Sequence, residues 1–126
     1  MNDITYQINV QVRPEFSEEH SDAAEDRFVF IYHVNIHNEG KVAAQLLRRH
    51  WIINDADGRV QEVEGEGVIG EQPVIQPGDE HAYQSFCILD TPIGCMQGSY
   101  QMRAADGNEF DAEIPPFTLA VPGSLN

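Results

Sequence analysis

The chain has 126 residues, and its 21 Asp and Glu against 7 Lys and Arg give a formal net charge of −14 at pH 7. Nucleic-acid backbones and anionic lipid headgroups attract proteins through Lys and Arg, so this excess of acid argues against nucleic-acid and membrane-surface partners. With 41% hydrophobic residues the chain can build a packed core, and its length predicts a single domain over residues 1–126.

Two features bear on the cellular compartment. No stretch reaches the roughly 18 uninterrupted apolar residues of a membrane helix, and the first ten residues lack the basic and apolar regions of an export signal. Cys87 and Cys95 are too few for a disulfide framework and lack the spacing of a zinc knuckle. We therefore expect a soluble cytoplasmic protein with free thiols.

The first third of the chain contains two predicted strands. Alternating apolar and polar residues indicate a half-buried strand over residues 4–12, ended by Pro14. The segment 15–26 carries six acidic residues and no Lys or Arg, so it is predicted to be a solvated connection with room for a short helical turn. Residues 27–37 are β-branched and aromatic, and one end of this second strand is expected to be buried on both faces.

The pattern in the rest of the chain predicts further short strands separated by turns. Residues 42–54 and 59–64 form a predicted hairpin about Asp55-Ala56-Asp57-Gly58, and a glycine-rich connection follows over residues 65–70. A strand over residues 81–89 comes after the turn Pro77-Gly78-Asp79. The last predicted strands are 99–104, 109–114 and, beyond a break at Pro115-Pro116, 117–121.

About seven short strands with frequent turns and no helical periodicity predict an all-β fold, an antiparallel β-sandwich. Tyr100, near the start of a late strand, stands where such a sandwich often places a corner tyrosine. Aromatic residues at period two are more typical of a sandwich core than of a binding platform. An exposed sheet edge, in contrast, accepts a partner strand, so edge strands are the favoured interaction surface.

The glycine-rich segment 65–70 matches the pattern G-x-G-x-x-G, whose glycines let backbone N–H groups approach a pyrophosphate. No helix pattern follows it, the neighbouring glutamates would repel phosphate, and Arg59 is the only cation nearby in the sequence. Glycines that serve a loop with positive φ are the favoured explanation, and the alternative is an anion site at Gly65, Gly67 and Gly70. Mg²⁺ or Co²⁺ would offset the repulsion by bridging carboxylates and phosphate.

Histidine, serine and cysteine residues do not assemble a catalytic set in the sequence. His33 and His37 share one face of a predicted strand, but strand rise places them about 13 Å apart, too far to ligate one ion. The same separation applies to His81 and Ser85, which therefore do not form a nucleophile–base pair. We expect no catalytic residue, no cofactor and no specific metal site, although weak diffuse attraction of cations follows from the net charge.

An ordered series of residues extends through nearly the whole chain. Its densest part consists of Arg49-His50-Trp51-Ile52-Ile53, Gly58, Val63, Gly65 to Gly70, Gln72-Pro73, Pro77-Gly78, Tyr83, Ser85, Leu89, Thr91-Pro92, Gly94, Met96, Gly98, Tyr100 and Met102. This series resembles the bacterial ApaG family. The resemblance implies an immunoglobulin/fibronectin type III-like sandwich, an association with cobalt resistance and magnesium efflux, and a likeness to eukaryotic domains that look like interaction modules. Phe86 departs from the family pattern, in which a small residue often follows the serine, and its ring is expected to restrict open space beside Ser85.

The leading hypothesis is a non-enzymatic module that binds a protein partner and is linked indirectly to cobalt resistance and magnesium efflux. The link is indirect because a chain without a membrane span offers no route for an ion. The alternative is a sensor that binds a pyrophosphate-containing nucleotide at the Gly65–Gly70 loop, with or without a divalent cation. Hydrolysis is a third possibility for which the sequence supplies no residues.

Overall fold

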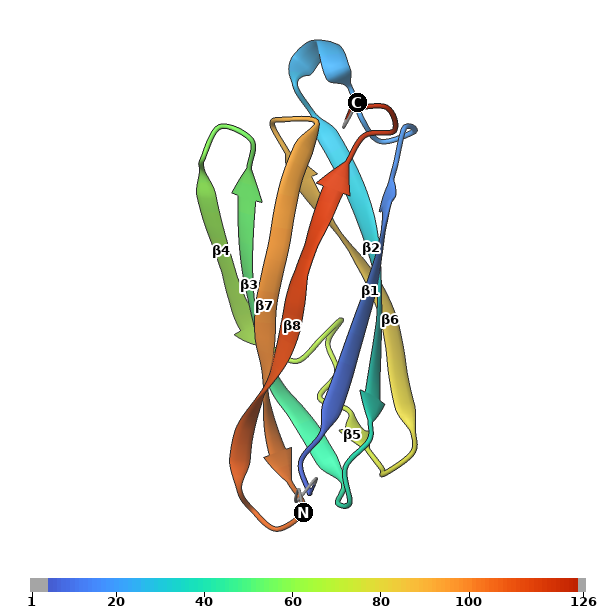
Figure 1. The fold of residues 1–126 in the computed structure, drawn as a ribbon, viewed down its shortest axis with the longest axis vertical. Helices are drawn as coiled ribbons and strands as arrows, with labels where there is room; N and C mark the ends of the chain where they lie inside the picture. The colour runs from blue at the N-terminus through green and yellow to red at the C-terminus, as the bar shows by residue number, and fades with distance from the viewer. Residues whose placement is uncertain (1–4, 125–126) are drawn as a thin grey trace.

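The computed structural model describes residues 5–124 and folds them into two antiparallel sheets packed face to face (Figure 1). The three-stranded sheet has the order β1-β2-β6, and the second sheet has the order β4-β3-β7-β8 with the short β5 beside β3. The strands are β1 (Ile8–Phe16), β2 (Phe28–Asn38), β3 (Ala44–Asp55), β4 (Val60–Glu66), β5 (Val74–Ile75), β6 (Glu80–Leu89), β7 (Ile93–Ala104) and β8 (Glu109–Ala120), and a 3-10 turn, η1, covers Ala23–Glu25. This architecture confirms the predicted immunoglobulin/fibronectin type III-like sandwich.

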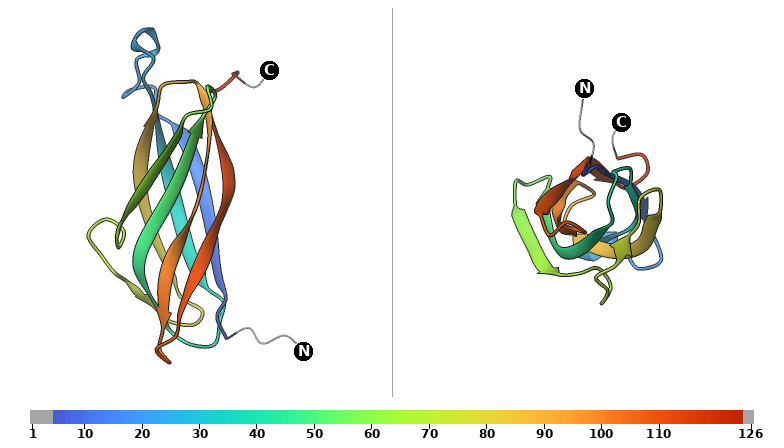
Figure 2. Two further views of the ribbon diagram at one scale, coloured as in Figure 1. Left: turned by 90° about the vertical axis from the view of Figure 1, so that its left-hand side faces the viewer. Right: turned by 90° about the horizontal axis from the view of Figure 1, so that it is seen from below.

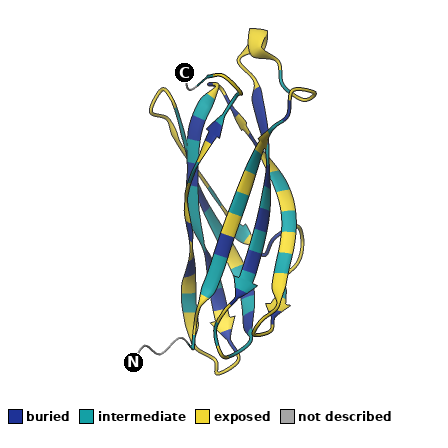
Figure 3. Cartoon of the chain, turned by 45° about the vertical axis from the view of Figure 1, so that its right-hand side comes forward, coloured by how far each residue is buried: buried dark blue, intermediate teal, exposed yellow. Residues whose placement is uncertain are grey.

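The two sheets face each other (Figure 2), and the side chains on their inward faces form a single apolar core. Buried and more exposed residues alternate along the strands, as Figure 3 shows, because successive side chains of a strand point to opposite faces. The first three residues of β2 are all buried, which confirms the predicted two-sided burial at that end. The largest side chains in the core are those of Trp51, Tyr100, Phe30, Ile36, Leu46, Met96 and Met102.

A β-bulge in β3 decides which of its residues face the core. The register with β7 shifts between Leu46 and Arg48. Even-numbered residues such as Leu46 point inward before the shift, and odd-numbered residues such as Trp51 point inward after it. One extra residue exchanges the two faces of a strand. The bulge therefore turns Arg49 toward the sandwich interior and Arg48 toward solvent.

Three prolines that were predicted to end or break strands lie inside them. Pro14 pairs with Tyr32 within β1, and Pro115-Pro116 falls inside β8, at a register shift opposite β7. Both strands are at sheet edges, where a missing backbone N–H does not interrupt a ladder on both sides. The predicted start of the first strand at residue 4 lies outside the described residues.

Strand β7 begins at Ile93, six residues before the predicted strand at residue 99. The glycines in this stretch permit close backbone approach instead of breaking the strand. A β-carbon at Gly98 would lie 2.0 Å from the carbonyl oxygen of His50 on β3. The two-residue strand β5 was also not predicted, and it packs Ile75 into the core beside Ala44.

The sandwich has two long sides at which an edge of one sheet faces an edge of the other. On one side β1 lies next to β8 (Figure 1). On the other side β4 faces β6, and the segment 67–79, which connects these two strands through β5, crosses the lower part of the opening (Figures 1 and 2). An ion pair of 2.7 Å between Arg59 and Asp90 bridges the upper part. A cleft lies in the middle of this side.

Candidate functional site

A cleft of about 300 Å³ lies between β4 and β6, in the open side of the sandwich. Its apolar walls include Trp51, Met96 and Val63, which come from the sheet that contains β4. Its polar lining includes Arg49, from that same sheet, and Ser85, from β6. An apolar cavity with a few converging polar groups is the usual form of a ligand site.

Arg49 enters the cleft because of the bulge in β3, and the glycine-rich segment holds its guanidinium in place. Its Nη1 donates hydrogen bonds of 3.0 Å to the carbonyl oxygens of both Glu66 and Gly67. Gly65 is the cross-strand partner of Arg49, and a β-carbon there would lie 2.7 Å from Nη1 and Nη2. The glycine at this position therefore leaves room for an arginine side chain.

The predicted site residues Gly65, Gly67 and Gly70 serve three different purposes. Gly65 belongs to β4 and to its pairing with β3, so it is not part of the connection that follows. Gly67 and Gly70 have φ values of 62° and 74°, which confirms the expectation of positive φ for these two. A β-carbon at Gly67 would lie 2.2 Å from the carbonyl oxygen of Glu71, so this position also requires close backbone approach.

Backbone N–H groups of this segment are engaged within the fold. Gly67 donates to the carbonyl oxygen of Leu47 at 2.9 Å, and Val68 and Glu71 exchange reciprocal hydrogen bonds of 2.8 and 3.0 Å. The intervening Ile69 and Gly70 both have positive φ, the conformation of a type I′ turn. Val68 is only 1% exposed and anchors the turn in the core. In a phosphate-binding loop the backbone N–H groups converge on the phosphate, whereas the N–H groups of Gly67, Val68 and Glu71 bond to carbonyl oxygens of the chain. Nucleotide binding at this segment stays a prediction.

Behind the cleft, three tyrosines form a polar cluster within the core. Burial raises the pKa of Tyr32, Tyr83 and Tyr100, while the nearby charge of Arg49 lowers each of these pKa values by a smaller amount. The hydroxyl groups of Tyr83 on β6 and Tyr100 on β7 form a hydrogen bond that joins the two sheets. Tyr100 thus lies in the middle of its strand and does not occupy the predicted corner position.

The thiol of Cys87 lies in the core beside the cleft, where it approaches the sulfur of Met96 at 3.7 Å. Burial raises the pKa of Cys87 to about 12, so the thiol is protonated at neutral pH and lacks the charge of a nucleophile or metal ligand. Cys95 is the other free cysteine.

The histidines bind separate neighbours. His33 contacts Glu15 at 3.0 Å, and His50 contacts Glu62 at 2.9 Å. Within residues 5–124, no three His, Cys, Asp or Glu side chains converge as metal ligands.

Strand β6 exposes an apolar surface on the outer face of its sheet. Phe86 is 62% exposed, and it adjoins a pocket of about 360 Å³ whose lining includes Val29, Ile31 and, at its rim, Arg27 and His20. Ser85 and Phe86 point to opposite faces of β6. The alternation along β6 directs the Phe86 ring away from the Ser85 hydroxyl, while both residues line the cleft between β4 and β6.

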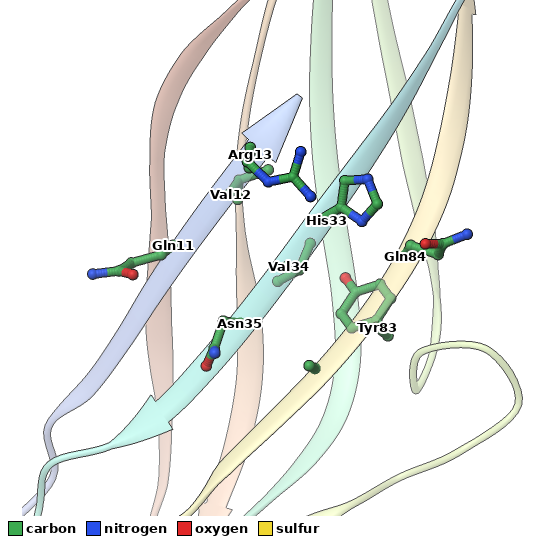
Figure 4. A pocket seen from close by; sticks show the side chains of 9 residues that line it. Gln11, Val12, Arg13, His33, Val34, Asn35, Tyr83 and Gln84 are labelled. Carbon is green, nitrogen blue, oxygen red and sulfur yellow. The ribbon is translucent and has the colours of Figure 1, made fainter. Parts of the chain in front are cut away.

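A broader polar hollow of about 630 Å³ continues down the same outer face (Figure 4). Arg13 from β1, His33 and Asn35 from β2, and Gln84 from β6 line it. The amide of Asn35 donates to Glu80 at 3.1 Å, whereas its buried Oδ1 has no partner among the described residues. This face combines an apolar end with a hydrogen-bonding end.

No helix within the described residues is long and apolar enough to cross a membrane.

Comparison with known proteins identifies the family to which this chain belongs. Residues 18–104 match the family model of the ApaG domain, DUF525. The chain is 58% identical over 121 residues to "Protein ApaG" of Thiobacillus denitrificans, an overlap that covers 96% of this chain and 95% of that protein. It is 55% identical over 126 residues to "Protein ApaG" of Pseudomonas aeruginosa, with both chains covered in full.

Solved structures show the same relationship. The crystal structure of the putative ApaA protein from Bordetella pertussis matches with a TM-score of 0.92 and 44% identity, over 94% of this chain and 97% of that one. The X-ray structure of structural-genomics target SoR45 matches with a TM-score of 0.89 and 44% identity, over 97% and 91% of the two chains. Sequence and fold agree over nearly the whole length, and the chain belongs to the ApaG family.

Proposed function

We propose that this chain is a non-enzymatic interaction module that binds an extended segment of a protein partner along the free edge of β6. The observation that carries the proposal is the composition of that edge. Residues 81–89 of β6 contain no Asp, Glu, Lys or Arg, in a chain in which 22% of residues are charged. An uncharged, partly apolar edge strand is the kind that accepts another strand.

The free edge of β6 is accessible between the crossing segment 67–79 and the Arg59–Asp90 ion pair (Figure 1). Strand β6 pairs with β2 only, and within the described residues no other backbone bonds to residues 80–89. A partner strand would therefore find a row of donors and acceptors there. Main-chain hydrogen bonds of this type supply affinity, and side-chain pockets beside the edge supply specificity.

The other three edges carry features that disfavour strand addition. Strands β1 and β8 contain prolines and lie beside each other on the far side of the sandwich. Strand β4 carries Glu62, Glu64 and Glu66. Prolines and charges are the usual means by which natural sheets protect their edges, so β6 is the exception in this fold.

The pocket beside Phe86 gives the proposed partner its chemistry. An extended segment on β6 would place alternate side chains on the outer face, where Phe86 and Ile88 are exposed. The pocket formed with Val29 and Ile31 suits an apolar side chain of the partner. Arg27 at the rim favours an acidic or carbonyl group next to it.

The physiological context proposed for this binding is the handling of divalent cations in the cytoplasm. The association with cobalt resistance and magnesium efflux comes from the family resemblance alone, and the role in it would be indirect, through the partner. Free thiols at Cys87 and Cys95 support a reducing compartment. The charge of −14 attracts cations diffusely, so no dedicated metal site is required for the proposal.

Affinity capture with matched variants tests the proposal. Phe86→Glu places a charge on the outer face of β6, and Val60→Glu places the same charge at a residue of similar exposure on β4, 64% against 62%. Wild type and Val60→Glu are expected to recover the same stoichiometric protein at low salt, and Phe86→Glu is expected to lose it. Equal recovery by both variants, recovery of no stoichiometric partner, or turnover of a nucleotide or polyphosphate by the purified chain would contradict the proposal.

A further inference from the structure

Arg49 lines a cleft in an acidic chain, and no carboxylate lies within ion-pair distance of it among the described residues. Four of the other arginines, Arg13, Arg48, Arg59 and Arg103, each have a glutamate or aspartate within 4.0 Å. Within residues 5–124, the hydrogen bonds of Arg49 go from Nη1 to two backbone carbonyl oxygens. Although the chain has 21 acidic residues, none of those described pairs with Arg49, and Arg27 is the other arginine without a carboxylate partner among the described residues.

The alternation of side chains along β4 explains why its glutamates do not contact Arg49. The glutamates of β4 alternate with Gln61, Val63 and Gly65, and the latter three are the strand partners of the inward-facing residues of β3. The side chains of Glu62, Glu64 and Glu66 therefore point to the outer face of the sheet. None of the residues that line the cleft is acidic, and Arg49 is the charged one. The cleft consequently favours an anion within a strongly acidic protein.

Arg49 still has donors to offer to such an anion. Its Nη1 is engaged, while Nε and Nη2 have no hydrogen-bond partner among the described residues. The Nε–H and Nη2–H groups form one edge of the planar guanidinium, and this edge matches the two oxygens of a carboxylate. The carbonyls of Glu66 and Gly67, together with the missing side chain at Gly65, hold the guanidinium before any ligand arrives.

The remaining cleft surface sets the size and shape of the ligand. Ser85 and Tyr32, which are cross-strand partners, bring two hydroxyl groups to the lining. The apolar lining consists of the buried side chains of Trp51 and Met96 together with Val63 and, from β6, the more exposed Phe86 and Ile88. A cavity of about 300 Å³ is at the small end of the range for ligand sites, so it suits a compact molecule.

We propose that the cleft between β4 and β6 binds a small organic carboxylate. The carboxylate accepts two hydrogen bonds from Nε and Nη2 of Arg49 and a third from the hydroxyl of Ser85, and the apolar body packs against Trp51. One guanidinium balances a single negative charge, which favours a carboxylate over a phosphate dianion. The inference rests on Arg49 of β3 and does not require the partner binding proposed above, although Phe86 and Ile88 of β6 also line the cleft.

Benzoate is a suitable probe, because it joins a carboxylate to a flat apolar ring. Trp51 is the only tryptophan of the chain and lies in the cleft, so its fluorescence reports occupancy without interference. The Nε–H signal of Arg49 in nitrogen-edited NMR gives a second, local readout. Benzamide has the same shape without the charge, and phenyl phosphate replaces the carboxylate by a phosphate.

Three variants separate the proposed site from nonspecific effects. Arg49→Gln removes the charge, Arg49→Lys keeps the charge without the two-donor edge, and Arg48→Gln removes the adjacent arginine on the opposite face of β3. Benzoate is expected to bind wild type and Arg48→Gln saturably and equally, and both Arg49 variants at least about tenfold more weakly, in line with a charge-assisted bidentate pair. Arg49→Lys keeps the test decisive if Arg49→Gln fails to fold.

The result that overturns the inference is equally specific. Benzoate binding that does not saturate at tens of millimolar, benzamide binding as tight as benzoate, phenyl phosphate binding tighter than benzoate, or unchanged affinity in the folded Arg49 variants would each contradict it. Partner capture by Arg49→Lys is expected to match that of wild type, because Arg49 lies on β3 and not on β6. The outcome is therefore distinguishable from that of the partner-capture experiment.

Discussion

The guanidinium of Arg49 lies over Gly65, its partner on the neighbouring strand, at a distance that leaves no space for a β-carbon between them. This contact gives the glycine-rich segment a structural purpose that its sequence pattern did not indicate. The segment supplies a gap at Gly65 and two carbonyl oxygens beyond it, and these fix a cation at the mouth of the cleft.

Substitution of Gly65 tests this relationship. In Gly65→Ala the new methyl group would lie 2.7 Å from Nη1 and Nη2, so the flexible end of Arg49 is expected to move away and lose its carbonyl contacts. We expect unfolding in urea to require about 1 kcal/mol less free energy, the size of a partly exposed charge-assisted bond. Gly98→Ala is the matched control, because there the obstacle is backbone at 2.0 Å, and a loss above about 3 kcal/mol is expected. Equal losses in the two variants would contradict the explanation.

The hydrogen bond between Tyr83 and Tyr100 is expected to couple the two sheets energetically. Tyr83→Phe and Tyr100→Phe each leave the other hydroxyl without its partner in the core, so each is expected to cost about 1–2 kcal/mol of unfolding free energy. The double variant removes both hydroxyl groups and is expected to cost less than the sum of the single losses. A double-mutant cycle in urea measures this coupling, and strictly additive losses would show that the contact contributes nothing.

Alkaline pH is expected to destabilise the fold through Cys87. Burial raises the pKa of its thiol from 9.0 to about 12, so the native state binds the proton more tightly than the unfolded state does. The resulting stability is fully present below about pH 9 and is lost as the pH rises from about 9 to 12. Cys87→Ala is expected to lower stability at neutral pH but to reduce the slope of unfolding free energy against pH in that window. An unchanged slope would contradict the assignment.

Tyr6 ties the start of the described chain to the turn between β7 and β8. Its ring stacks on Phe110 at 5.1 Å, and its hydroxyl donates to the carboxylate of Asp106. This hydrogen bond is the largest cause that lowers the pKa of Asp106. Tyr6→Phe is expected to raise the pKa of Asp106 toward its ordinary value, as followed by carboxyl-carbon NMR during an acid titration. A pKa that does not change would contradict the assignment to Tyr6 and leave the hydrogen bonds from Asn108 and from the Asp106 backbone as its cause.

The sequence was sufficient to predict the fold class and most strands because one face of each is buried, and alternation reveals this directly. Because of this alternation, the predicted bounds of β2 and of the β3–β4 hairpin agree closely with the structure. The prolines of β1 and β8 were wrongly predicted to end their strands. A strand tolerates proline when it lies at a sheet edge, and both of these strands do. Edge position follows from the pairing of distant strands, which local patterns do not contain.

The cleft could not be predicted for a related reason. Which of Arg48 and Arg49 faces the interior depends on the bulge beside Leu46, and neither the leucines nor the arginines of this stretch mark its position. Arg59 was taken as the cation nearest the glycine-rich segment, whereas the structure pairs it with Asp90 and places Arg49 there instead. The adjacency of Arg49 to Gly65 through strand pairing was the missing information.

Hydrogen exchange of the captured complex tests the strand-addition proposal most directly. A partner segment that adds to β6 would give its edge amides new hydrogen bonds, so residues 80–89 are predicted to exchange more slowly in the complex than in the free chain, while β4 remains unchanged. Slower exchange confined to β4 or to residues 67–71, with β6 unaffected, would contradict the proposal that this edge is the binding surface.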